Sequence, residues 1–174
     1  MTITHEQLAA IMSGAPSARI DLFLSPLNNA MDEFKINTEK RQAAFIAQLA
    51  HESGQFRYVR ELASGAAYEG RKDLGNTQPG DGVKFKGRGL LQITGRFGYT
   101  ACMMGLGIDC VEHPELLEEP ENAARSASWW WHTHGLNEMA DSGNFARITR
   151  RINGGVNGMA DRLAFYVKAQ EVLA

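Results

Sequence analysis

The stretch AFIAQLAHESGQF, Ala44–Phe56, decides the fold because its apolar residues repeat at helical spacing. Phe45, Leu49 and Glu52 stand at positions i, i+4 and i+7, so the glutamate continues the apolar face of the predicted helix. A buried ionised carboxylate is costly, so Glu52 must be paired, lie at a wet cleft, or be held partly protonated. On the helix alone we favour the simpler alternative, in which Glu52 reaches solvent from the helix end.

The composition is that of one globular domain, and we expect residues 1–174 to form it without a separate binding module. A net charge of −2 and a pI of about 6.2 argue against nucleic acid as a partner. The N-terminal residues do not resemble a signal peptide, so we expect a soluble, cytoplasmic product without stable membrane insertion. Cys102 and Cys110 are expected to be reduced and to have no functional role.

Helical patterns dominate both ends of the chain. The expected helices cover residues 4–12, 18–34 with a break at Pro26, 38–53 with a cap at Asn37 or Thr38, 120–134, 144–152 and 158–173. The last of them is expected to turn Met159, Leu163, Tyr166 and Val167 to one face. Between Gly54 and Gly98 the sequence is rich in glycine and polar residues, and GLLQIT, residues 89–94, is predicted to be a strand. These patterns predict a mainly α fold with a small β-hairpin or short strands beside a substrate cleft.

Several kinds of site fail on spacing. His51 and Glu52 begin a zinc-protease pattern, but Gln55 stands where the second histidine is required. The segment KGRGLLQITG, residues 86–95, lacks the third glycine of a dinucleotide site and the Gly-Lys-Ser/Thr of a phosphate loop. We therefore expect neither a metal nor another cofactor, and carboxylate chemistry remains.

Glu61 and Glu69 could each face Glu52 across a cleft. Glu61 follows Glu52 by nine residues, and Gly54 permits the chain to turn between them. Two carboxylates on opposite sides of a cleft are the groups that glycoside hydrolysis requires. The simpler interpretations are an ion pair of Glu61 with Arg57 and a surface contact of Glu69.

In an extended segment, Gln92 and Thr94 project to the same side and could bind sugar hydroxyl and N-acetyl groups. Their simpler interpretation is an ordinary edge strand. Trp129, Trp130 and Trp131 are adjacent, so they cannot all face one cleft, and we place most of them in the core.

Four segments in this order resemble glycoside hydrolase family 19, the chitinase family, and specifically its bacteriophage and prophage endolysin branch. They are AFIAQLAHESGQF, FKGRGLLQITGRFGY, PELLEEPENAARSASWWW and RRINGGVNGMADRLAFY. The resemblance runs from about residue 40 to the C-terminus. It implies a lysozyme-like, mostly helical (α+β) fold with a cleft, no metal, and hydrolysis of β-1,4 bonds with inversion.

The resemblance also implies roles for two carboxylates. Glu52 is the general acid, and an apolar wall behind it is expected to favour its protonated form. The general base falls on Glu61, with Glu69 as the alternative. An inverting enzyme holds its two carboxyl groups roughly 6.5–9.5 Å apart, which leaves room for the attacking water.

The other site residues follow from the same resemblance. Thr94 positions the water, while Gln92 and Tyr99 contact the substrate. Asn153 and Arg162 are further cleft residues. The simpler interpretations are a helix cap for Asn153 and a solvated ion pair with Asp161 or a neighbour for Arg162.

The expected function is hydrolysis of bacterial peptidoglycan by a monomeric endolysin. Such an enzyme accumulates in the host cytoplasm and reaches the periplasm and cell wall through a pore made by another protein. The alternatives are a chitinase and, in another class, an inactive sugar-binding protein.

Overall fold

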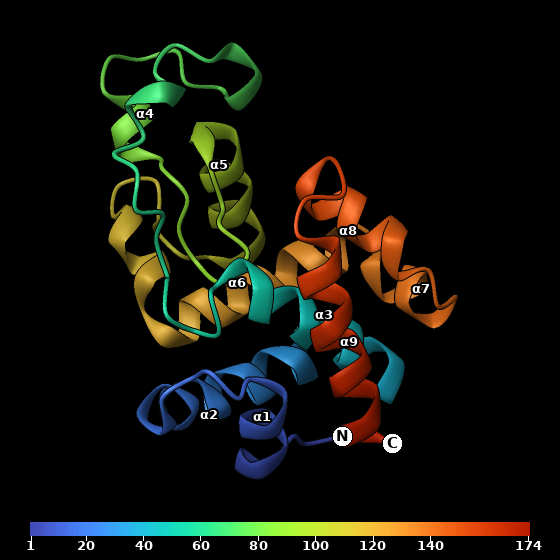
Figure 1. Cartoon of the computed structure of the whole chain (residues 1–174). Coiled ribbons are helices and arrows are strands. Elements are labelled where there is room, and N and C mark those ends of the chain that lie inside the picture. Colours follow the sequence, from blue (N-terminus) through green and yellow to red (C-terminus); the bar gives the residue numbers. More distant parts are fainter.

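The computed structural model describes residues 1–174, and almost all of its regular structure is helical (Figure 1). The α-helices are α1 (His5–Ile11), α2 (Ser17–Glu33), α3 (Glu39–Glu52), α4 (Asp81–Lys84), α5 (Gly95–Leu106), α6 (Pro120–Thr133), α7 (Leu136–Asp141), α8 (Phe145–Asn153) and α9 (Met159–Leu173). Short 3₁₀ helices lie at Ala66–Tyr68, Lys72–Leu74 and Pro114–Glu118. The predicted mainly α fold is confirmed. None of the helices is both long and apolar enough to cross a membrane.

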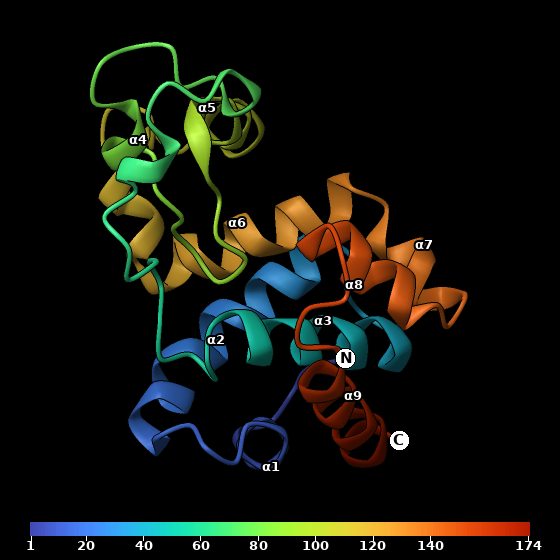
Figure 2. The same ribbon diagram turned by 45° about the horizontal axis from the view of Figure 1, so that its top comes forward.

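The helices are arranged in two lobes (Figures 1 and 2). α4, α5 and the loops before them form one lobe, while α1, α2, α3, α7, α8 and α9 gather in the other. α6 contacts α5 in the first lobe and α2 and α7 in the second. Each lobe has its own core, and Trp130 on α6 packs against both.

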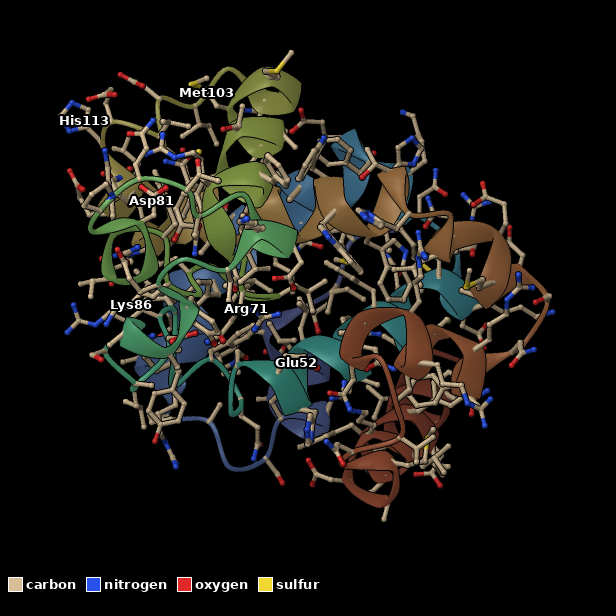
Figure 3. The ribbon with its side chains drawn as sticks, turned by 90° about the horizontal axis from the view of Figure 1, so that it is seen from above. Glu52, Arg71, Asp81, Lys86, Met103 and His113 are labelled. Carbon is tan, nitrogen blue, oxygen red and sulfur yellow. The ribbon has the colours of Figure 1, made fainter.

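α3 forms the centre of the larger lobe, as the sequence predicts. Every residue from 42 to 50 is buried. The Phe45 and Trp131 rings pack edge to face with their centroids 5.1 Å apart. Thr38, not Asn37, caps the helix, because its hydroxyl accepts a hydrogen bond from the Arg41 amide at 3.4 Å. The helix ends at Glu52, which lies at the space between the lobes (Figure 3).

Two predictions about helices are wrong. Pro26 lies inside α2 and does not break it. Apolar residues on both sides of the proline, such as Phe23 and Leu27, are fully buried, and their packing holds the helix across the missing hydrogen bond. In α9 the predicted face is rotated, because Leu163 and Val167 are 42% and 52% exposed.

The residues that α9 buries are Arg162, Ala169 and Leu173, at positions i, i+7 and i+11. A charged residue thus stands in the buried row. The ion pair of Arg162, described below, determines which face of α9 meets α3.

The segment predicted to be a strand, residues 89–94, is mostly a turn. The backbones of Arg88 and Ile93 exchange two hydrogen bonds of 3.1 and 2.8 Å, and residues 89–92 connect them. Gln92 has a positive φ of 51°, which strand residues do not adopt. The small hairpin is therefore reduced to isolated bridges, and the predicted alternation of side chains does not exist.

A buried ion pair joins α4 to α5. The Asp81 carboxylate is 2% exposed and accepts hydrogen bonds from Arg96 at 2.6 and 2.9 Å and from the Gln78 amide at 3.1 Å. The hydrogen bonds from Arg96 lower the pKa of the Asp81 carboxyl group below its usual value. Such a carboxylate stabilises the fold above its unfolded pKa, and this contribution is lost as the pH falls through the folded pKa.

We expect Asp81→Asn to lower the free energy of unfolding by about 2–4 kcal/mol at pH 7, because Arg96 loses its buried partner. Urea unfolding at pH 7 and at pH 3 measures this, and the difference from wild type should shrink at the lower pH. The control is Asp73→Asn, which removes the exposed pair with Arg71 and should change stability little. Equal losses in the two variants would contradict the account.

Candidate active site

Glu52 is ion-paired with Arg162 at the edge of the space between the lobes. The Arg162 guanidinium lies 2.6 Å from Glu52 Oε1 and is itself only 2% exposed. Its other nitrogens bind Gln48 Oε1 at 2.6 Å and the Asn157 carbonyl oxygen at 3.0 Å. Gln48 in turn donates to Thr149 Oγ1 on α8 at 2.9 Å, so α3 and the loop before α9 hold this arginine directly, and α8 supports it through Gln48.

One sequence-based expectation is wrong here. A cation, not an apolar wall, stands beside Glu52. Asp161 does not pair with Arg162, because it lies 2.7 Å from His51 Nδ1 instead. No hydrogen bond within the chain uses Glu52 Oε2, so this oxygen is available to a ligand while Oε1 stays on the guanidinium.

Asn153 belongs to the same cluster. It is the last residue of α8, and its Nδ2 lies 3.5 Å from the Asn157 carbonyl oxygen that Arg162 also binds. The helix is capped by Gly154, with φ of 76°, so Asn153 is not the cap. Its exposed side chain is free to meet a ligand.

Glu61 comes from the other lobe and is held through one oxygen. Its Oε2 accepts hydrogen bonds from the Tyr68 hydroxyl at 3.0 Å and the Gly87 amide at 3.1 Å. Burial, and then the hydrogen bond to Glu61, raises the pKa of Tyr68. Glu61 Oε1 is buried and has no hydrogen-bond partner, and the ion pair with Arg57 is not formed. Unpaired buried polar atoms are rare and recur at functional sites.

Glu69, the alternative second carboxylate, is occupied. Its two oxygens accept hydrogen bonds from the Gly80 and Gly82 amides, each at 2.8 Å. Glu69 thereby closes the loop before α4, and neither Arg71 nor Lys72 pairs with it. Of the two glutamates, only Glu61 has an oxygen that accepts no hydrogen bond within the chain.

Gln92 lies next to Glu61, and Thr94 contacts Gln92. A Cβ atom built on Gly87 would stand 2.8 Å from Glu61 Oε2 and 2.9 Å from Gln92 Oε1, so these two side chains converge on one glycine. The Thr94 hydroxyl donates to the Gln92 carbonyl oxygen at 3.1 Å and does not cap α5. Its oxygen can still accept a hydrogen bond, as a group that positions a water must.

Gln92 and Thr94 also line a hollow of about 560 Å³ between α5, α6 and the end of α8, which we call the apolar hollow. Its other walls are mostly apolar and include Leu91, Phe97, Trp129, Trp130, His134 and Ile152. Sequence reasoning missed Phe97, which is 63% exposed, and assigned most of the three adjacent tryptophans to the core. Only Trp131 is fully buried. Two adjacent helical residues, Trp129 and Trp130, can border the same wide hollow. The run of tryptophans was therefore the available signal, which the argument from helical spacing set aside.

Tyr99 cannot contact a substrate as expected. It is fully buried in the core of the smaller lobe, where burial raises its pKa well above the usual value. Its hydroxyl donates to the Lys86 carbonyl oxygen at 2.5 Å and accepts from Arg88 at 3.0 Å. Tyr99 follows Phe97 by two positions in α5, and only Phe97 turns outward.

We expect Gly87→Ala to reduce activity at least tenfold with little loss of stability. The added methyl group would displace the mobile ends of Glu61 and Gln92 and leave the backbone in place. Such small displacements are costly to catalysis. Measured kcat/KM and melting temperature test this, with Gly155→Ala as the control, because a methyl group there meets open space. A variant that keeps full activity would contradict the proximity of Gly87 and Glu61.

Residues 29–150 match the family model described as chitinase class I, of glycoside hydrolase family 19. The chain belongs to glycoside hydrolase family 19. It is therefore a glycoside hydrolase, with Glu52 and Glu61 inside the matched range.

Two relatives of this family 19 chain are a bacterial and a plant protein. A glycosyl hydrolase family 19 domain-containing protein of Haemophilus influenzae is 32% identical over 72% of this chain and 76% of its own length. An endochitinase of Arabidopsis thaliana is 35% identical over 72% of this chain. The match spans only 44% of that plant enzyme.

Solved structures agree with the fold. A bacterial family 19 chitinase superposes with a TM-score of 0.82 at 23% identity, covering 100% of this chain and 96% of the other. A class IV chitinase from Zea mays gives a TM-score of 0.77 at 25% identity, with coverages of 99% and 92%. The lysozyme-like fold expected for this family 19 chain is thus confirmed.

Proposed function

We propose that this chain is an endolysin that hydrolyses β-1,4 bonds in the glycan of bacterial peptidoglycan. The observation that carries the proposal is a pair of carboxylates from different lobes in different surroundings. Glu52 is held by a guanidinium through one oxygen, and Glu61 has one oxygen without any partner. General acid–base hydrolysis requires two such groups, one that gives a proton and one that takes it.

In the proposed reaction, Glu52 Oε2 gives its proton to the leaving glycosidic oxygen as the bond from that oxygen to the anomeric carbon breaks. Water attacks the same carbon from the opposite face, and Glu61 Oε1 takes the proton that the water loses. Thr94 orients this water through its hydroxyl, and Gln92 binds the sugar beside it. The products are two shorter glycans, one with an inverted anomeric hydroxyl group.

The resemblance of four segments to phage and prophage endolysins supports peptidoglycan as the substrate. Chitin is the alternative, because the plant relative is named an endochitinase and both polymers contain β-1,4-linked N-acetylglucosamine. As an endolysin, the chain would act as a monomer at the wall, after a separate pore-forming protein opens the membrane to it.

The test is digestion of purified, protein-free peptidoglycan, followed by borohydride reduction and mass spectrometry, with chitin hexamer in parallel. New muramitol or glucosaminitol ends support the proposal and identify the bond cut. Cleavage of chitin alone would make the chain a chitinase. Binding of either glycan without cleavage would favour an inactive sugar-binding protein.

A further inference from the structure

α8 carries three arginines that nothing in the chain neutralises. Arg147, Arg150 and Arg151, which we call the α8 arginine cluster, are all exposed, and none takes part in an ion pair or a side-chain hydrogen bond. Seven of the other nine arginines are paired with carboxylates, as Arg41 is with Asp141, and only Arg19 and Arg57 are not. With a net charge of only −2 for the whole chain, the cluster is a local concentration of positive charge.

This cluster lies beside the apolar hollow. The three arginines, Met139 and His134 line a second, shallow depression of about 500 Å³, and His134 also lines the apolar hollow. The His134 ring stacks on Trp130 at 3.9 Å, so a single side chain separates the two depressions. Burial lowers the pKa of His134, and the nearby Arg151 guanidinium acts in the same direction.

We propose that the α8 arginine cluster binds the carboxylates of the peptide stems that peptidoglycan carries and chitin lacks. The inference rests on the proposed function, because it assumes that a wall glycan occupies the cleft. Sugar rings and N-acetyl methyl groups suit the apolar walls around Trp130. A stem peptide attached to a sugar in the apolar hollow would extend past His134 to the arginine cluster. The guanidinium groups of the cluster are suited to binding carboxylates.

Charge complementarity favours a stem peptide over a chitin chain as the ligand of the α8 arginine cluster. A chitin chain is uncharged and offers an arginine cluster no counterion, whereas each stem peptide ends in free carboxylates and can carry more. Exposed ion pairs are individually weak and are screened by salt. The cluster should therefore select between substrates by a moderate factor that depends on ionic strength.

The test compares Arg147→Gln/Arg151→Gln with a control of the same charge change, Lys40→Gln/Lys168→Gln, at exposed sites outside both depressions. The substrates are peptidoglycan, the same glycan after an amidase has removed its stems, and chitin hexamer. We expect the arginine variant to lose about tenfold in kcat/KM on stem-bearing glycan only, and to lose less at 0.5 M NaCl than at 0.05 M. Equal losses on all substrates, or no loss, would overturn the inference.

A binding measurement separates this inference from the proposed function. Fluorescence anisotropy follows a labelled disaccharide–tetrapeptide, with the same compound amidated at its carboxylates as the matched ligand. Wild type should bind the acidic form at least fivefold more tightly, and the arginine variant should bind both forms alike. If wild type cuts only chitin, the proposed function fails, and the anisotropy still decides whether the cluster recognises stem carboxylates.

Discussion

Glu52→Gln is expected to reduce kcat by about 10²–10⁴-fold, the usual contribution of a general acid. Glutamine has the same shape, and its amide oxygen can take the place of Oε1 beside the Arg162 guanidinium, so the buried hydrogen bonds of Arg162 to Gln48 and Asn157 should persist. What the variant loses is the proton for the leaving oxygen. Steady-state rates on peptidoglycan or chitin hexamer measure the loss, and the melting temperature should stay close to that of wild type.

The matched control is Glu33→Gln. Glu33 is also the last residue of an α-helix and is also paired with an arginine, Arg125, at 2.9 Å, but it lines a separate depression between α2 and α6. This variant should keep wild-type activity. Comparable losses in the two variants would mean that Glu52 acts only through the stability of its ion pair.

Glu61→Gln is expected to lower kcat by a similar factor, with a much smaller effect on KM. The amide oxygen can keep the hydrogen bonds from Tyr68 and Gly87, but the amide nitrogen at the place of Oε1 cannot take a proton from water. The control is Glu69→Gln, which removes the charge that accepts hydrogen bonds from the Gly80 and Gly82 amides. This variant should keep kcat within about twofold of wild type, because Glu69 does not touch the reacting atoms. The reverse result would transfer the role of base to Glu69.

The elements that the sequence predicted well are those with strong local signals. The apolar row of α3, the cap at Thr38 and the glycines Gly135 and Gly154 after α6 and α8 lie where the patterns indicated. In each case the decisive interactions lie within a few residues of one another. α5 was missed because three glycines, at positions 95, 98 and 105, weaken its helical pattern.

The features that the sequence did not predict depend on contacts between distant parts of the chain. Arg162 stands near the C-terminus, and nothing local to either residue indicates that it pairs with Glu52. The turn at residues 89–92 depends on Arg88 and Ile93 bonding across it, and the choice between Glu61 and Glu69 depends on the Gly80 and Gly82 amides. Side-chain roles at this site therefore emerge only when both lobes are assembled.

Direct attack by a water held between Glu61 and Thr94 is the central claim, and the anomer of the first product tests it most directly. Proton NMR of a fresh digest, recorded before the new reducing end equilibrates, distinguishes the α from the β form. The account predicts the α anomer, because a single displacement inverts the β bond. An initial β anomer would mean retention through a covalent or substrate-assisted intermediate, and would contradict the roles assigned to Glu61 and Thr94.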